Sequence, residues 1–272
     1  MTPAPPLFDR SALAAHRRRS RADALFLHEA ARDEVEDRLA MVNRVFTSAA
    51  VVTPFPALWQ GRLAGARLVA DDEVLDLAPD SVDLAVHAMG LHWANDPVGQ
   101  LIQCRRALRP DGLLLCVLLG GRTLAELRAA LSEAESRITG GLSPRVAPMA
   151  EIRDLGALLQ RAGLALPVAD SVPLTAEYRD LWHLMHDLRA MGETNALAGR
   201  LRHPTRRAVF DLAGALYAER FAAPEGRIRA TFELVCLTGW APDASQPKPL
   251  RPGSAQARLA DALGTTETGL GD

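Results

Sequence analysis

The sequence predicts an α/β fold of the doubly wound kind, built around a mostly parallel sheet. Residues 81–119 carry this prediction, because they read as a strand, a loop, a helix, a turn and a second strand. The turn is Pro110-Asp111-Gly112, in which proline fixes φ and glycine tolerates positive φ. The second strand, residues 113–119, is apolar throughout, as expected for a strand covered on both faces. Ligands of such sheets bind beyond the carboxyl ends of the strands, here around residues 89–93 and 120–121.

The amino-terminal part is predicted to be helical before the chain enters the sheet. Residues 11–44 are rich in alanine, arginine and glutamate and carry an imperfect apolar face. A short strand follows at residues 49–52 and runs directly into prolines, which cannot donate to a strand ladder. After it we expect a short helix at residues 57–63 and another strand at 66–70.

The carboxyl-terminal half alternates further helices and strands. Residues 123–137 are predicted as an amphipathic helix, with Thr123 and Glu126 as a capping box. Gly163 has the place of a C-cap after the next helix, residues 150–162. The remaining elements are expected in this order: a strand at 164–178, cap helices at 180–221, a strand at 227–237, and an extended tail from 241 with a last helical turn or two at 255–263.

Composition excludes several classes of protein. The chain has 272 residues, 48% of them hydrophobic, which is enough to bury a sizeable core. A net charge of −2 argues against nucleic acid or an acidic membrane as a partner. The basic run Arg17-Arg18-Arg19 lies among acidic residues and is expected on a solvated helix face. No stretch approaches the about 20 apolar residues of a membrane span, and no apolar signal core is present, so we expect a cytoplasmic protein without stable membrane insertion.

The three cysteines, Cys104, Cys116 and Cys236, are too few and too scattered for a zinc cluster. Their odd number favours reduced thiols, as in the cytoplasm. Cys104 falls on the predicted helix and Cys116 in the apolar strand, so both are expected to be small buried hydrophobes rather than nucleophiles.

No glycine-rich loop follows the first strand, although a sheet that holds a nucleotide cofactor usually has one there. Residues 49–52 continue into Thr53-Pro54-Phe55-Pro56, which contains neither glycine nor a carboxylate. Glycine matters at this point because a side chain would keep the backbone away from the cofactor. The cofactor-binding half of the sheet is therefore predicted to be reduced.

Several stretches resemble one superfamily. One set of motifs resembles the class I S-adenosylmethionine-dependent methyltransferases of type 11, in the branch with the malonyl-carrier-protein methyltransferases. These motifs are Leu91-His92-Trp93, the Asn-Asp step that follows, and residues 105–112. Further stretches resemble the bacterial branch of the respiratory complex I assembly factor 5 family: residues 7–10, 140–148, 154–163, 187–195 and 245–255.

The resemblance implies a Rossmann-like methyltransferase sheet of seven strands with an antiparallel carboxyl-terminal edge, N-terminal helices and a helical cap. It implies three parts: a helical extension at residues 1–48, a methyltransferase-like core at 49–240 with cap helices at about 180–221, and an extended tail at 241–272. The stretch that resembles the third strand of the family begins at Leu68, so only residues 57–67 separate it from Pro56. We therefore expect the strand that holds the cofactor's ribose to be missing.

The resemblance also implies S-adenosylmethionine as cofactor. Asp71 or Asp72 would face its adenine, and a loop would form the floor of the pocket. The residues of that loop are Met89, Gly90, Leu91, His92 and Trp93. For His92 and Trp93, packing under the cap is an equal alternative to contact with the cofactor.

Three residues are candidates for substrate binding, namely Arg145, Glu193 and Asn195. Glu193 and Asn195 carry a resemblance to the family signature, but a role in the turn after the cap helix would explain them as well. Arg145 would bind a carboxylate or orient its own loop. The sequence assigns no catalytic residue.

Three hypotheses for the function follow. The first is an S-adenosylmethionine-dependent methyltransferase, whose chemistry needs mainly positioning. The second is an assembly factor that contacts a core subunit of respiratory complex I and is peripheral to a bacterial inner membrane through that partner. In its enzymatic version, this protein modifies an arginine of the subunit. The third is a noncatalytic scaffold on the same fold. Arginine hydroxylation would call for a redox metal or an oxidising cofactor. His183, His186 and Asp187 are a candidate metal cluster, and the alternative for them is an exposed polar helix face.

Overall fold

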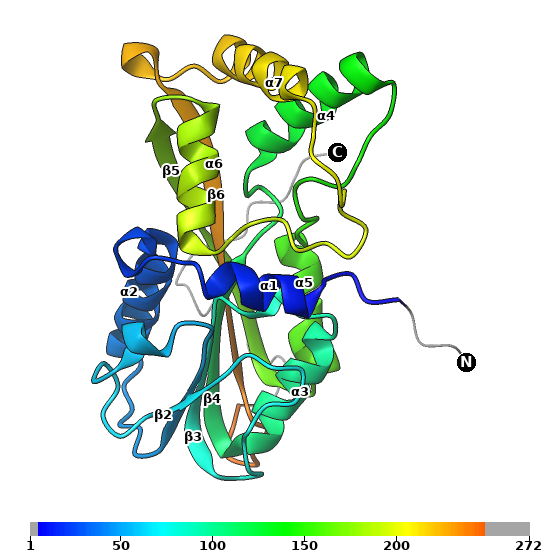
Figure 1. The fold of residues 1–272 in the computed structure, drawn as a ribbon. Coiled ribbons are helices and arrows are strands. Elements are labelled where there is room, and N and C mark those ends of the chain that lie inside the picture. Colours follow the sequence, from blue (N-terminus) through cyan, green and yellow to red (C-terminus); the bar gives the residue numbers. More distant parts are fainter. Residues whose placement is uncertain (1–4, 248–272) are drawn as a thin grey trace, which may run out of the picture. The chain divides into compact units, whose positions relative to one another are not determined.

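Six strands form one mixed sheet in the computed structural model, which describes residues 5–247 (Figure 1). The order across the sheet is β2-β1-β3-β4-β6-β5. The strands are β1 (Ala49–Val52), β2 (Arg67–Val69), β3 (Val82–Ala88), β4 (Leu108–Leu119), β5 (Ala165–Tyr178) and β6 (Ile228–Trp240).

Strands β1 to β4 pair in parallel, and β6 pairs antiparallel with both β4 and β5. The predicted α/β sheet with an antiparallel carboxyl-terminal edge is therefore confirmed. The described residues form six strands, one fewer than the seven of the family, as expected from the predicted loss of one strand. Strand β2 pairs directly with β1, and Val52 lies opposite Val69. The short connection at residues 57–66 leaves no length for a further strand between them.

Seven helices accompany the sheet within the described residues: α1 (Arg10–Arg17), α2 (Phe26–Met41), α3 (Pro97–Ala107), α4 (Ala125–Thr139), α5 (Ile152–Arg161), α6 (Leu181–Met191) and α7 (Arg207–Arg220). Short 3-10 turns lie at η1 (Ala22–Ala24), η2 (Pro56–Trp59), η3 (Leu91–Trp93) and η4 (Pro224–Gly226).

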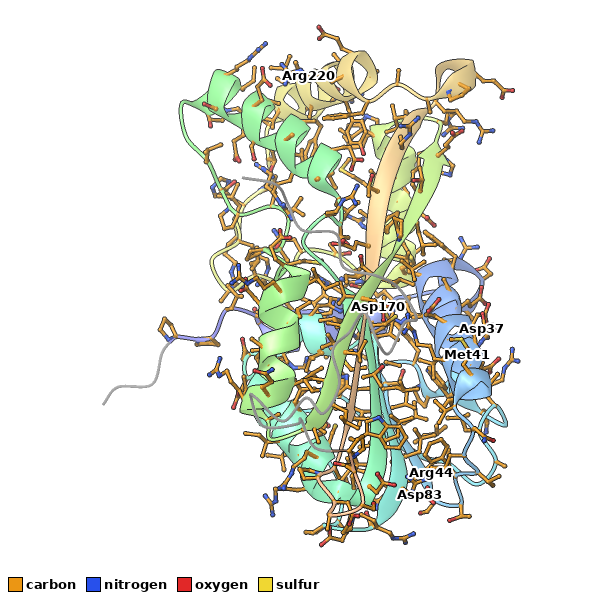
Figure 2. All side chains as sticks on the ribbon, turned by 180° about the vertical axis from the view of Figure 1, so that it is seen from behind. Asp37, Met41, Arg44, Asp83, Asp170 and Arg220 are labelled. Atoms are coloured by element: carbon orange, nitrogen blue, oxygen red, sulfur yellow. The ribbon has the colours of Figure 1, made fainter. Side chains whose placement is uncertain are left out.

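Helices cover both faces of the sheet. Helices α3 and α5 pack on one face, where Leu101 and Leu159 meet Leu114 of β4 in one core cluster. Helix α2 packs on the other face through Leu27 and neighbouring apolar residues. Because alternate residues of β4 point to opposite faces, its unbroken apolar run serves both clusters. Figure 2 shows the side where Asp170 of β5 lies beside α2, whose Arg38 donates to that carboxylate at 2.8 Å.

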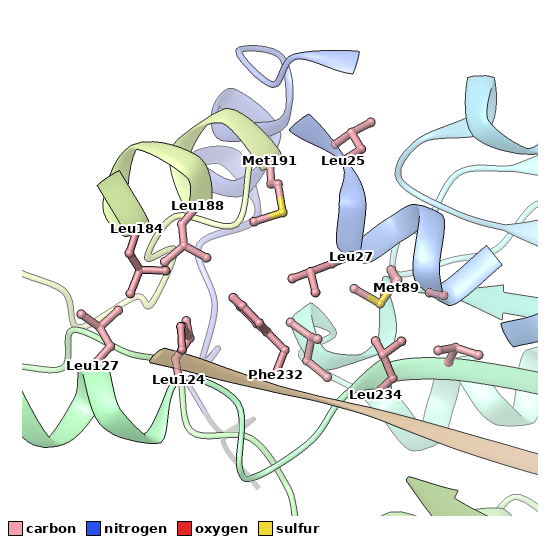
Figure 3. Close-up of a cluster of buried hydrophobic side chains, with 14 of the residues drawn as sticks. Leu25, Leu27, Met89, Leu124, Leu127, Leu184, Leu188, Met191, Phe232 and Leu234 are labelled. Carbon is pink, nitrogen blue, oxygen red and sulfur yellow. The ribbon is translucent and has the colours of Figure 1, made fainter. Parts of the chain in front are cut away.

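Helices α4, α6 and α7 form a cap near the far ends of β5 and β6 (Figure 1). Figure 3 shows how leucines of α6 and α4 converge there with Phe232 of β6 and Leu27 of α2. Phe232 and Leu184 are completely buried. The cap therefore shares one hydrophobic core with α2 and the sheet.

Three local predictions are wrong, each because a distant segment supplies the hydrogen bonds. The helix predicted over residues 11–44 is broken between α1 and α2, where the N–H of Arg21 donates to the carbonyl of Ala190 at 2.8 Å. Thr123 and Glu126 form no capping box, since Thr123 accepts from the N–H of Glu233 and Glu126 accepts from Thr231. The turn at residues 110–112 lies within β4, where the N–H of Asp111 donates to the carbonyl of Ala241 at 3.1 Å.

The chain divides into two compact units, residues 1–242 and residues 243–272. All the elements above belong to the first. The described part of the second is a turn at residues 243–247, in which the N–H of Ser245 donates to Asp243 at 2.9 Å. The helical turn predicted at residues 255–263 lies outside the described residues. None of the helices in residues 5–247 has the length and apolar character needed to cross a membrane.

Candidate functional site

The loop after β3 brings residues 89–93 against the carboxyl ends of the strands. Met89 has a left-handed φ of 57°. Gly90 lies so close to Asp71 that a Cβ there would be 2.8 Å from its carboxylate oxygen Oδ2. Met89 and Leu91 point into the two core clusters and are almost fully buried. Their side chains therefore serve packing, and the backbone of Gly90 is the part of the loop that approaches Asp71.

Glu193 is the centre of a buried polar cluster. It follows Gly192, which ends α6 with a φ of 82°. Its Oε2 accepts from the indole Nε1 of Trp93 at 2.7 Å and lies 3.4 Å from Nε2 of His92. Its Oε1 lies 3.3 Å from Nε2 of His28, outside hydrogen-bonding geometry, and neither atom has a hydrogen-bond partner among the described residues.

The cluster keeps Glu193 ionised. Burial by itself raises the pKa of this carboxyl group, but contacts with His28 and His92 outweigh burial and hold the pKa well below its usual value. His92 is held in turn by the N–H of Leu119, which donates to its Nδ1 at 3.5 Å. A buried carboxylate thus lies where the loop after β3 meets the cap.

Glu193 lines a cavity of about 250 Å³ beneath the cap, which we call the cap cavity. The walls of the cap cavity are mainly apolar, with leucines of α4 and α6, Phe210 of α7 and Phe232 of β6. All three predicted substrate residues, Arg145, Glu193 and Asn195, line it, together with Trp93. Residues far apart in the sequence therefore meet at one cavity.

Arg145 and Asn195 already have structural partners. The guanidinium of Arg145 donates to both carboxylate oxygens of Glu135, at 3.0 and 2.6 Å, and to Thr205. The side chain of Asn195 donates to the carbonyl of Pro144 and accepts from the N–H of Leu197. Of these three residues, Glu193 is therefore the one with a buried side-chain atom, Oε1, that has no hydrogen-bond partner within the described residues.

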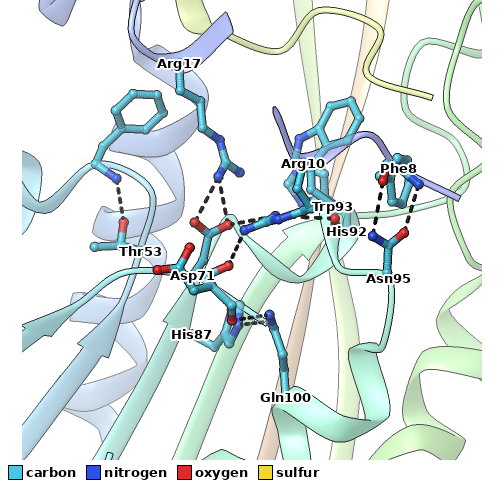
Figure 4. A network of polar contacts seen from close by, with 12 residues as sticks. Phe8, Arg10, Arg17, Thr53, Asp71, His87, His92, Trp93, Asn95 and Gln100 are labelled. Carbon is cyan, nitrogen blue, oxygen red and sulfur yellow. Dashed lines mark hydrogen bonds and ion pairs between the residues drawn. The ribbon is translucent and has the colours of Figure 1, made fainter. Parts of the chain in front are cut away.

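A second cavity, of about 480 Å³, lies at the carboxyl ends of β1 and β2; we call it the strand-end cavity. Asp71 and Asp72, predicted to face the cofactor's adenine, both line it. Figure 4 shows Asp71 held by α1: Nη1 of Arg17 donates to both of its carboxylate oxygens at 2.9 Å, and Arg10 lies 3.7 Å away. The side chain of Asp71 is only 7% exposed. Its carboxylate is thus already engaged by the chain's own arginines.

Residues 53–56, which directly follow β1, have no backbone N–H left for a ligand. The N–H of Thr53 donates to Val69 at 2.9 Å, and that of Phe55 to Oγ1 of Thr53 at 3.2 Å. Pro54 and Pro56 have none. A cofactor carboxylate, which a glycine-rich loop would bind through such groups, finds no backbone donor on residues 53–56.

These residues fit S-adenosylmethionine poorly. The cofactor carries a sulfonium and an ammonium group beside one carboxylate, so its net charge is positive. The strand-end cavity is lined by Arg10, Arg17 and Arg18 against Asp71 and Asp72. A cationic ligand would meet an excess of positive charge there, and the buried carboxylate that could bind it is taken.

Sequence reasoning missed two residues of these sites. Arg17, expected on a solvated face, has a side chain only 11% exposed. The spacing of Arg17 from Arg10 and Leu13 could have indicated this burial, because residues three, four and seven apart lie on one face of a helix and Leu13 is apolar. His28 is 3% exposed and contacts both Phe55, which lines the strand-end cavity, and Glu193. Nothing in the local sequence distinguishes His28 from an ordinary helix residue.

The candidate metal cluster on α6 is not assembled. Asp187 accepts a hydrogen bond from Tyr178 at 2.8 Å, and the ring of His183 packs against Tyr178. In residues 5–247 no group of three histidine, cysteine or acidic side chains is placed to hold a metal ion.

Comparison with known proteins agrees with the fold. The family model "Methyltransferase domain" matches residues 26–116. The arginine-hydroxylase NDUFAF5, mitochondrial, of Dictyostelium discoideum is 38% identical over 200 residues, which cover 73% of this chain and 46% of that protein. The protein of the same name from Danio rerio is 36% identical over 194 residues, covering 71% and 60%.

A malonyl-[acyl-carrier protein] O-methyltransferase of Laribacter hongkongensis is 36% identical over 200 residues, covering 71% of this chain and 65% of that protein. Among solved structures, the YcgJ protein of Bacillus subtilis aligns with a TM-score of 0.46 at 12% identity, covering 77% of this chain and 97% of that one. The chain belongs to the class I methyltransferase superfamily, in the complex I assembly factor 5 branch. It spans about half the length of the NDUFAF5 relatives that it matches.

Proposed function

We propose that this chain is an arginine-binding assembly factor, which takes the side chain of an arginine from a complex I subunit into the cap cavity. The observation that carries the proposal is the buried, ionised carboxylate of Glu193 on the wall of that cavity. The name of the NDUFAF5 relatives, arginine-hydroxylase, supports arginine as the residue recognised.

The chemistry of the cap cavity suits an arginine side chain. Its apolar walls, among them Leu127, Leu188 and Phe232, match an aliphatic stem, while a guanidinium needs a carboxylate at the inner end. The carboxylate of Glu193 supplies this acidic group on the wall of the cavity. Binding would bring the guanidinium to Oε1, which now faces His28 without a hydrogen bond.

The malonyl-carrier-protein methyltransferases suggest a different substrate, a carboxylate. Arg145 would be its binding residue in the cap cavity, but Glu135 already takes two of its nitrogen atoms. Arg189 also lines the cavity and is exposed. The buried charge left for recognition is thus negative, which favours a cationic substrate.

The family also suggests S-adenosylmethionine as a cofactor and methyl transfer as the reaction. The charge and donor pattern of the strand-end cavity argues against it, so the proposed function does not depend on it. Titration of the full chain with S-adenosylmethionine tests this point independently of arginine binding.

Peptides test the proposed function directly. Peptides that tile the arginine-containing segments of the host's complex I core subunits would be titrated into the full chain, each beside a copy with citrulline in place of arginine. Citrulline keeps the shape and loses the charge, so at least one arginine peptide should bind more tightly than its citrulline copy, and Glu193→Gln should remove the difference. Equal binding of both copies, or an unchanged preference in Glu193→Gln, would refute the proposal.

Glu225→Gln is the matched control for that experiment. Glu225 is exposed in η4 and lines neither cavity. Its substitution removes the same charge and should leave the preference for arginine intact.

A further inference from the structure

We propose that the strand-end cavity binds a small organic anion, carrying a phosphate or carboxylate group, through Arg17 and Arg18. This inference concerns a different cavity from the arginine site and does not rest on the proposed function. It follows from the charges, the hydrogen-bond donors and the apolar wall at the carboxyl ends of β1 and β2.

The charges lining the strand-end cavity do not balance. Three arginines and two aspartates line it, which leaves an excess of one positive charge. Asp71 is shared between Arg10 and Arg17, so a single carboxylate faces two guanidinium groups. Among the described residues, the guanidinium of Arg18 has no hydrogen bond or ion pair. An anion would complete this arrangement.

Donors at the cavity are also left without acceptors. Arg17 uses Nη1 for Asp71, whereas its Nε and Nη2 are buried without a hydrogen-bond partner among the described residues. Buried donors are nearly always paired, and an oxyanion accepts from guanidinium nitrogens in a two-pronged geometry. An oxyanion in the cavity would supply the acceptor that these two nitrogens lack.

The remaining wall suits an organic body rather than a bare ion. Leu13 of α1, Phe55 of the loop after β1, and Leu68 of β2 contribute apolar surface to the cavity. A ligand with a flat or apolar part would cover this surface while its charged end meets the arginines. S-adenosylmethionine has the flat adenosine but the wrong charge.

Calorimetric titration of the full chain at low ionic strength tests the inference with adenosine diphosphate, inorganic phosphate, succinate and S-adenosylmethionine as probes. Adenosine diphosphate should bind with one site per chain, and at least about tenfold more tightly than S-adenosylmethionine. Phosphate and succinate separate the two anion types, and binding of either supports the site. Arg18→Gln should weaken binding about tenfold through loss of a charge-assisted contact.

Arg106→Gln is the matched control, because Arg106 is an exposed arginine near the end of α3, where the chain enters the amino end of β4. It should leave binding unchanged. Arg17→Gln should abolish binding; should that variant fail to fold, Arg18→Gln still carries the test. The inference is overturned if no anionic probe binds at millimolar concentration, if S-adenosylmethionine binds as tightly as adenosine diphosphate, or if Arg18→Gln binds like the wild type.

Discussion

The indole N–H of Trp93 donates to the carboxylate of Glu193 at 2.7 Å, across 100 residues of sequence. This hydrogen bond joins the loop after β3 to the turn that ends α6. His28 of α2 and His92 lie against the same carboxylate. One buried acid thus connects the loop after β3, helix α2 and the cap.

Replacement of Glu193 by alanine should lower the free energy of unfolding by about 3 kcal/mol, since it leaves the buried indole N–H of Trp93 without its acceptor and removes the carboxylate that His28 and His92 contact. Glu193→Gln keeps an oxygen for Trp93 and should cost clearly less. Urea denaturation followed by circular dichroism measures both. Equal losses for the two variants would show that the carboxylate is not what connects these segments.

Asp71 should matter for stability because it is the shared anion of two arginines from α1. Asp71→Ala leaves Arg17 largely buried without a counter-charge, and we expect a loss of roughly 2–3 kcal/mol. Asp23→Ala is the control, because the Arg21–Asp23 pair is exposed on both sides and should change stability little. Thermal unfolding of both variants gives the comparison; similar melting temperatures would contradict the role given to Asp71.

The ion pair of Glu135 with Arg145 makes stability depend on pH in the acid range. Burial raises the pKa of Glu135, but hydrogen bonds from Arg145 and Ser143 outweigh it and lower the pKa from 4.5 to about 2. The folded state therefore binds this proton less readily than the unfolded chain. The resulting stabilisation is complete above pH 4.5 and is lost as the pH falls toward 2.

Glu135→Gln should therefore lower stability at neutral pH and flatten its decline between pH 4.5 and 2. Urea midpoints at several pH values provide the measurement. An unchanged slope in this variant would mean that other carboxyl groups account for the acid sensitivity.

The three cysteines should be unreactive in the folded protein. All are buried, and burial raises the pKa of Cys104 and of Cys236 to about 12 and that of Cys116 well above its usual value. A disulfide reagent should modify no thiol at neutral pH and all three after denaturation. Rapid modification of the native protein would show that one of them is accessible.

Phe232 should be among the most costly side chains to remove. It is completely buried, packs edge to face on Phe26, and lines the cap cavity. Phe232→Ala should lower stability by about 3–5 kcal/mol, because the space it leaves joins an existing cavity and cannot collapse easily. Leu142→Ala, at a side chain that is 71% exposed, should be nearly neutral in the same denaturation assay.

Much of the fold was predictable because its determinants are local. The apolar run of β4, the strands β3 and β6 and the helix ended by Gly163 follow from periodicity and turn residues, which act over a few positions. The errors arose where a distant segment took over a local role, as when β6 bonded Thr123 and Glu126. A capping pattern cannot reveal that another strand will offer better partners.

The sequence by itself determined the superfamily, the α/β sheet with its antiparallel edge, and the absence of glycine after the first strand. It also identified Arg145, Glu193 and Asn195 as candidates, and the structure brings them to one cavity. Only the tertiary structure decided which charges meet: Arg17 with Asp71, and His28 with Glu193. The physical reason is that a buried charge is defined by its partners, and these partners come together only when separate helices pack on the same end of the sheet.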